Sequence, residues 1–198
     1  TWDANTNWTT SKTATVTFNS AGIETGLAQY YIKSTVAGTL PAGAKTQTCG
    51  TETEPSNCTN ETTTAVAANT WYRVTGTTNV TVTTNGSMYA LTTDGRNKKS
   101  SSTLTITTID TTEPEITKEL IETVRTDRVS LQMACSDESG ITKYEFSKDG
   151  GSTWVDRGTT ASYTFTNLDQ TTNYNFVGRC TNGSGLKTTS TKAGTTLT

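Results

Sequence analysis

The stretch YTFTNLDQTTNYNFVGRC, residues 163–180, decides the fold, because it sets Leu168, Tyr174 and Cys180 at equal six-residue steps in a polar run. Its second part carries apolar or small residues at every second position, at Tyr174, Phe176, Gly178 and Cys180. Successive side chains of a β-strand point to opposite faces, so these four point to one face. Cys180 is therefore in phase with the buried side of its strand.

The segment RVSLQMAC, residues 128–135, alternates in the same way, and its last apolar position is Cys135. If the two strands belong to opposite sheets, a Cys135–Cys180 disulfide crosses the core. It would close a loop of about 46 residues and stabilise the fold by about 4 kcal/mol. The remaining pair, Cys49 and Cys58, would close a loop of about 10 residues worth about 2.5–3 kcal/mol.

Composition supports an all-β protein and limits its partners. Hydrophobic residues make up 31% and charged residues 17%, the net charge is −2, and threonine, which suits the solvent face of a sheet, is abundant. The absence of a basic cluster argues against nucleic acid, and no apolar run is long enough to insert in a membrane. Histidine is absent, which removes the commonest catalytic base and metal ligand. Four cysteines without CxxC spacing indicate an oxidising compartment.

Internal repetition predicts two domains. TDGRNKKSSST (93–103) aligns with TNGSGLKTTST (181–191) at a constant offset of 88, and IDTTEPEI (109–116) resembles a linker. We therefore expect two tandem antiparallel β-sandwich domains, at residues 1–112 and 113–198. The first half carries about 30 extra residues, an insertion that we place at about 34–70.

Alternating segments predict the strands, and we expect no helix. In the second half they are 115–123, 128–135, 141–147, 152–156, 161–166, 173–181 and 186–191; in the first half they are 13–18, 29–33, 79–83, 87–93 and 101–109. Asp149-Gly150-Gly151 and Asn85-Gly86 are hairpin signals, because tight turns need the positive φ that glycine adopts readily.

The second half resembles a fibronectin type III domain, or the broader group of bacterial immunoglobulin-like domains. LDQTTNY places Leu168, Thr172 and Tyr174 at the positions of that family's Leu-x-Pro-x-Thr-x-Tyr pattern, with Gln170 in place of the proline. The resemblance implies a tyrosine corner, in which the hydroxyl of Tyr174 bonds back to the backbone near the turn that follows Leu168. The cross-core disulfide is an immunoglobulin trait, so the topology stays open at this point. The first half resembles the group more weakly. In the alignment of the two halves Thr92 corresponds to Cys180, so the first half should lack the cross-core disulfide.

The insertion and the aromatic residues are the candidate binding features. Long loops on a rigid sandwich often carry binding sites, although a surface flap stapled by Cys49 and Cys58 is the simpler interpretation. Exposed Trp71 and Tyr72 would stack on a sugar, whereas Trp154 is expected in the core. Asp110, Glu113, Glu115, Asp137 and Glu138 cluster near the domain boundary; solvated charges are favoured over a calcium site. We predict no catalytic residue, cofactor or metal site.

Tandem modules of this kind resemble parts of large secreted or wall-attached bacterial proteins. The resemblance implies a non-enzymatic extracellular spacer or display stalk that takes part in adhesion or ligand binding. Its partners would be a host or cell-surface protein or glycan and the neighbouring domains of a longer chain. The alternatives are an accessory carbohydrate-binding or linker module of a secreted carbohydrate-active enzyme, and a component of a phage or pilus appendage.

Overall fold

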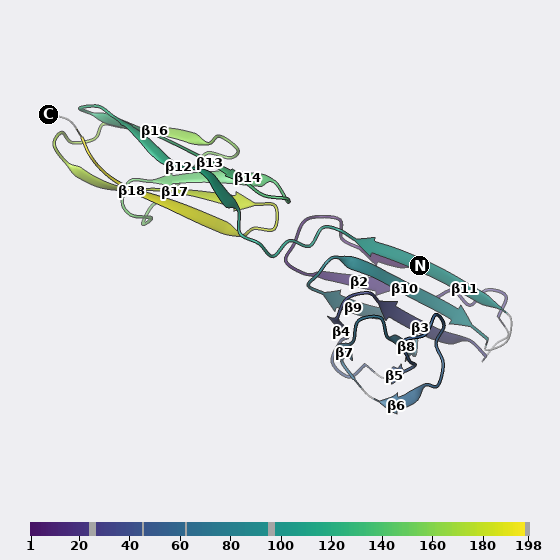
Figure 1. Cartoon of the computed structure of the whole chain (residues 1–198). Coiled ribbons are helices and arrows are strands. Elements are labelled where there is room, and N and C mark those ends of the chain that lie inside the picture. The colour runs from purple at the N-terminus through teal and green to yellow at the C-terminus, as the bar shows by residue number, and fades with distance from the viewer. Residues whose placement is uncertain (24–26, 45, 62, 95–97, 197–198) are drawn as a thin grey trace. The chain divides into compact units, whose positions relative to one another are not determined.

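The computed structural model describes the chain except for residues 24–26, 45, 62, 95–97 and 197–198. The chain divides into two compact units, which we call unit 1 (Thr1–Ile109) and unit 2 (Asp110–Thr198). The described residues of both are built from strands, as expected (Figure 1). Among them there is no helix long and apolar enough to cross a membrane. The sequence places the division after residue 112, but Asp110 already bonds to the body of unit 2.

Unit 2 is a sandwich, and its residues up to 196, which the structure describes, form seven strands: β12 (Glu115–Val124), β13 (Arg128–Ser136), β14 (Ile141–Ser147), β15 (Val155–Asp156), β16 (Ser162–Thr166), β17 (Asn173–Asn182) and β18 (Lys187–Thr195). One antiparallel sheet has the order β12-β13-β16 and the other β15-β14-β17-β18. The fourth strand, β15, therefore joins the sheet of β14, unlike the fourth strand of a constant-type immunoglobulin domain, which joins the first two. Unit 2 thus has the strand arrangement of a fibronectin type III domain.

The alternating residues that predict the strands of unit 2 also fill its core. Val129 and Leu131 of β13 and Phe176 of β17 are at most 1% exposed. Gly178 lies on the same inward face, where an added Cβ would stand 2.6 Å from Sδ of Met133. Glycine at this position lets the two sheets approach each other.

The described residues of unit 1 form eleven strands: β1 (Trp2–Ala4), β2 (Lys12–Val16), β3 (Gln29–Ser34), β4 (Gly38–Thr39), β5 (Thr46–Thr48), β6 (Thr59–Glu61), β7 (Ala65–Val66), β8 (Trp71–Val74), β9 (Thr78–Val82), β10 (Gly86–Thr93) and β11 (Lys99–Ile106). Its sheets have the orders β1-β2-β9-β4-β7 and β11-β10-β3-β8-β5-β6. Without β4–β7, this is the strand arrangement of unit 2. The aligned strand pairs β10/β11 and β17/β18 match, although residues 95–97 between the first pair lie outside the described residues.

One of the two hairpin predictions is confirmed and the other is wrong. Gly150 and Gly151 have φ of 71° and 91°, and they lie between the paired strands β14 and β15. Asn85-Gly86 instead connects β9 to β10, which belong to different sheets. The side chain of Asn85 accounts for its position there, because it exchanges two hydrogen bonds with the backbone of Ile109, at 2.8 and 2.9 Å.

Candidate functional site

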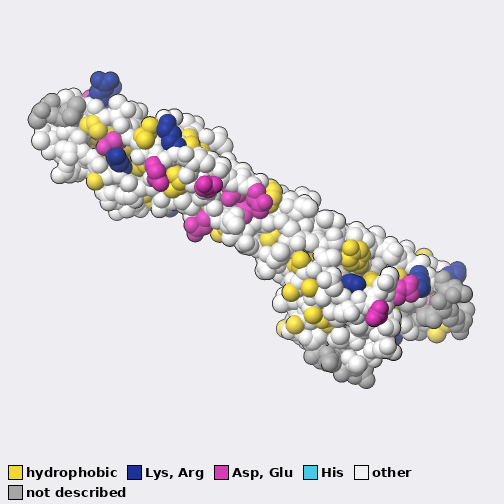
Figure 2. All heavy atoms as spheres, viewed as in Figure 1, with side chains coloured by type: hydrophobic (Ala, Val, Ile, Leu, Met, Phe, Trp, Pro, Cys, Tyr) yellow, Lys and Arg dark blue, Asp and Glu magenta, His cyan; other side chains and the backbone are white. Residues whose placement is uncertain are grey.

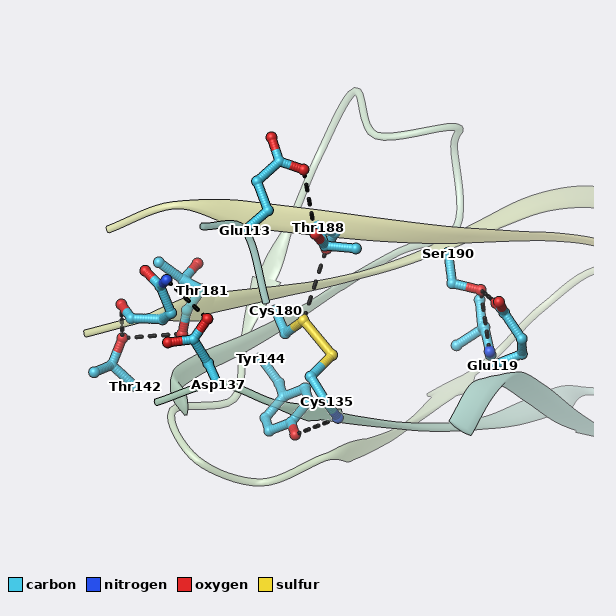
Figure 3. Close-up of a disulfide and its surroundings, with 12 residues drawn as sticks. Glu113, Glu119, Cys135, Asp137, Thr142, Tyr144, Cys180, Thr181, Thr188 and Ser190 are labelled. Carbon is cyan, nitrogen blue, oxygen red and sulfur yellow. Dashed lines mark hydrogen bonds between the residues drawn. A yellow bond between two sulfur atoms is a disulfide. The ribbon is translucent and has the colours of Figure 1, made fainter. Parts of the chain in front are cut away.

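A disulfide between Cys135 of β13 and Cys180 of β17 joins the two sheets of unit 2 across the core, as predicted (Figure 3). Cys180 is fully buried. Tyr144 lies beside the bond, and its hydroxyl accepts a hydrogen bond from the backbone N–H of Cys135 at 3.1 Å. The disulfide is therefore part of the packed interior and is shielded from solvent on the side of Cys180.

The tyrosine corner is also present in unit 2. The hydroxyl of Tyr174 accepts a hydrogen bond from the backbone N–H of Asp169 at 3.0 Å, immediately after the buried Leu168. The ring of Tyr174 lies 5.8 Å from that of Phe176, centroid to centroid. The corner thus fixes the turn that leads from one sheet to the other.

The insertion of unit 1 extends both sheets and is not only a loop. Its strand β4 pairs with β7 and β9 on one sheet, and β5 pairs with β6 and β8 on the other. Periodicity could not predict these strands because each has only two or three residues. The interpretation as a stapled flap applies to residues 49–58 alone, which the Cys49–Cys58 disulfide closes and which we call the cap.

The cap covers a small second core on the outer face of the six-stranded sheet. This cluster consists of Tyr31, Cys49, Trp71 and Leu91, with exposures from 0 to 9%. Nε1 of Trp71 and Nζ of Lys33 both donate to the backbone oxygen of Glu52, at 3.0 and 3.3 Å. Nζ of Lys99 forms an ion pair with Glu54. The cap is therefore held by side chains from three strands of the sheet as well as by its disulfide.

The expectation that Trp71 and Tyr72 present exposed rings is wrong. Their exposures are 6 and 4%, because the cap covers one face of β8 and the main core of unit 1 covers the other. Trp71 faces the cap, whereas Tyr72 packs in the main core and its hydroxyl accepts a hydrogen bond from the N–H of Ala67. Stacking of either ring on a ligand would require part of the fold to open.

Trp154 also differs from the expectation, because it is half-buried and does not belong to the core cluster of unit 2. The guanidinium of Arg179 lies 3.9 Å from the centroid of its ring. Arg179 in turn forms an ion pair with Glu145 at 2.8 Å. Trp154 thus belongs to a polar network on the outer face of β14 and β17.

Asp110 is not a solvated charge but is 2% exposed and fully bonded within unit 2. Its Oδ1 accepts hydrogen bonds from the backbone N–H and hydroxyl of Thr112. Its Oδ2 accepts from the hydroxyl of Ser139 at 2.7 Å, the amide of Asn182 at 2.8 Å and the hydroxyl of Ser184 at 3.2 Å. Burial by itself would raise the pKa of Asp110, but these donors lower it to about 2.

Three of the other four acidic residues of the group are solvent-exposed, and the fourth, Asp137, is half-buried. An open hollow is lined by the exposed side chains of Glu113, Glu115 and Glu138 together with Asp137. Figure 2 shows acidic side chains gathered on the surface of unit 2. Asp137 accepts hydrogen bonds from Ser139. Within the described residues, no group of three or more acidic, cysteine or histidine side chains is arranged to hold a metal ion.

The geometry defines a class of protein, a tandem pair of fibronectin type III-like β-sandwich modules. No protein-family model matches the sequence, and no curated protein shows significant similarity to it. Solved structures of tandem fibronectin type III domains are similar to the chain. The FN1–FN3 domains of chicken CNTN1 share 13% identity at a TM-score of 0.42, over 99% of this chain and 66% of that one.

Two further structures show the same kind of likeness. The fibronectin(III)-like modules of Clostridium thermocellum CbhA share 11% identity at a TM-score of 0.38, over 100% of this chain and 94% of that one. A two-domain fibronectin type III segment of chicken tenascin shares 11% identity at a TM-score of 0.35, over 99% and 98% of the two chains. The strand order and register of this chain, rather than these likenesses, define its fold.

Proposed function

We propose that the chain is a non-enzymatic module pair of an extracellular surface protein, which spaces and displays other parts of that protein and takes part in adhesion. Its two disulfides fit an oxidising compartment. The bacterial origin and the attachment to a cell wall belong to this proposal. So do the partners, a host or cell-surface protein or glycan and the neighbouring domains of a longer chain.

The observation that carries the spacer role is the anchoring of two consecutive residues. Ile109 is 4% exposed, and its backbone N–H and C=O both bond to Asn85 of unit 1. Asp110 is 2% exposed and bonds to Ser139 and Asn182 of unit 2. A single peptide bond therefore joins a residue anchored in unit 1 to a residue anchored in unit 2, which supports a role in which the chain bears tension.

Pulling the whole chain by its ends in a force-spectroscopy experiment tests this role. We expect two separate unfolding events, one for each unit. In oxidising buffer the event of unit 2 is shortened, because the disulfide keeps the 45-residue segment between Cys135 and Cys180 from extending. At about 3.4 Å per residue the missing length is about 15 nm, and a reducing agent restores it.

The outcome that contradicts the spacer role is extension of the oxidised chain without resistance. Hydrolysis of a glycan or peptide by the isolated chain would contradict the non-enzymatic role. Both assays use the chain as it stands and need no knowledge of its ligand.

A further inference from the structure

The outer face of the three-stranded sheet of unit 2 is hollowed into an open trough of about 600 Å³. Its floor is formed by β12, β13 and β16, and its rim by the residues that precede β16. Sites of this volume are typical of ligand-binding pockets, and an open trough suits a chain more than a small enclosed molecule.

The pairing of β12, β13 and β16 aligns the side chains on the floor of the trough in two rows across the strands. In the first, Thr123, Ser130 and Thr164 lie opposite one another, and the hydroxyls of Ser130 and Thr164 are 2.8 Å apart. All three side chains in this row carry a hydroxyl, which donates one hydrogen bond and accepts others. The row therefore offers a line of hydrogen-bonding groups that matches a polyol.

The second row consists of Ile121, Gln132 and Ser162. Ile121 is 43% exposed and is one of two large hydrophobic residues exposed in the described chain. It places an aliphatic surface beside an amide and a hydroxyl. This combination fits a sugar ring, which has apolar C–H faces and a polar edge.

Arg157 supplies the charge of the trough. Its guanidinium lies over the ring of Tyr163, 5.3 Å from the centroid, and its backbone N–H bonds to the oxygen of Tyr144. No described carboxylate forms an ion pair with Arg157, whereas Arg128 pairs with Asp127. None of the residues that line the trough is acidic. A stacked guanidinium with free donors is well suited to bind a carboxylate through paired hydrogen bonds.

We propose that this trough binds a carboxylate-bearing oligosaccharide, with a uronate carboxylate on Arg157, ring hydroxyls on the row of Thr123, Ser130 and Thr164, and an apolar ring face on Ile121. A single guanidinium does not provide the many phosphate contacts that nucleic acid binding needs. The trough also lacks the cluster of exposed aromatic and methionine side chains that forms the centre of a typical protein interface. The proposal rests on the surface role given above and names its ligand class.

Calorimetric titration of the whole chain with hexamers of galacturonate, guluronate and glucuronate tests the proposal. The comparison ligands are the same hexamers with reduced carboxyl groups and a hexaglutamate peptide. We expect at least one uronate hexamer to bind at least tenfold more tightly than its reduced form and than the peptide. Charge-assisted hydrogen bonds contribute roughly 1.5–3 kcal/mol, so Arg157→Gln should weaken binding about tenfold or more.

Matched variants distinguish binding in the trough from nonspecific attraction of the ligand to positive charge. Lys192→Gln removes the same charge from an exposed residue of β18 on the other sheet and should leave the affinity unchanged. Ile121→Ser should weaken the uronate hexamer and its reduced form alike, and Arg157→Lys should restore part of the affinity. Circular dichroism establishes that each variant is folded.

Absence of binding by all three uronate hexamers would overturn the proposal. So would equal binding of the glutamate peptide, or equal losses in Arg157→Gln and Lys192→Gln. Force spectroscopy of the spacer role does not involve the trough, so failure of one proposal is distinguishable from failure of the other.

Discussion

Units 1 and 2 share one strand arrangement but are stapled at different places. In unit 2 the disulfide links the two sheets through the core, whereas in unit 1 Thr92 takes the position of Cys180 and is buried without such a link. Unit 1 instead carries the insertion, which adds strands to both sheets, and a cap that is closed by its own disulfide. A small sandwich is thus stabilised either by a disulfide through its core or by added edge strands and a disulfide-closed surface loop.

Removal of the cross-core disulfide should have the largest effect. The double variant Cys135→Ser, Cys180→Ser should lower the free energy of unfolding of unit 2 by about 4 kcal/mol, because the unfolded chain regains the freedom of the closed loop. Differential scanning calorimetry of the whole chain measures the transition of each unit. The transition of unit 1 should not move, and an equal shift of both would show that the two staples are not independent.

Removal of the cap disulfide should have a smaller and more local effect. The double variant Cys49→Ser, Cys58→Ser should destabilise unit 1 by about 2.5–3 kcal/mol, less than in unit 2 because the loop-closure entropy rises with the logarithm of loop length. Trp71 lies under the cap, so its fluorescence should move to longer wavelength if the cap loosens. An unchanged transition of unit 1 would mean that Lys99, Lys33 and the strand pairing hold the cap without the disulfide.

Asp110 is bonded to Ser139, Asn182 and Ser184 of unit 2, so its loss should lower the stability of unit 2 and leave that of unit 1 unchanged. Its pKa is lowered to about 2 in the folded state, so its stabilisation is complete above the ordinary pKa and is lost as the pH falls from about 4 to about 2. Asp110→Asn should therefore cost about 2 kcal/mol at neutral pH. Urea unfolding at a series of pH values should show the difference from the parent chain shrinking toward pH 2, and a constant difference would contradict this account.

Loss of the tyrosine-corner hydroxyl should have the smallest effect. Tyr174→Phe keeps the ring against Phe176 but leaves the N–H of Asp169 without its partner, at a cost of about 1 kcal/mol. Urea unfolding of unit 2 measures the change. A loss as large as that of the cross-core disulfide would indicate that the hydroxyl supports more of the turn than its single hydrogen bond suggests.

A strand could be predicted from the sequence where it is long enough for its residue pattern to show which face is buried. Strand β13 alternates between buried and more exposed residues from Arg128 to Met133, so Val129 and Leu131 mark both the strand and its buried face. Strand β17 is buried on both faces over much of its length, and there it is the large side chain of Phe176 that marks the core. The short strands of the insertion carry too few residues for any period to show. Asn85-Gly86 has the sequence of a hairpin turn, yet its role depends on a partner, Ile109, that is distant in the chain.

The candidate sites could be predicted less well than the fold. The exposure of Trp71 depends on whether the cap folds over the outer face of β8, and local sequence does not report this long-range contact. Asp110 looks like other acidic residues of a linker until Ser139 and Asn182 are brought to it. The trough of unit 2 combines outward positions of three strands, and only the register brings Thr123 and Thr164 to the same row.

The closed cap has a consequence for proteolysis. Residues 51–54, 56 and 57 are exposed, and they form the kind of polar surface loop at which proteases cut first. A cut there falls inside the ring closed by Cys49 and Cys58, so the two fragments stay covalently joined. Such a nick would escape notice on a non-reducing gel and would appear only after reduction, so unit 1 can survive a cleavage that would otherwise divide it.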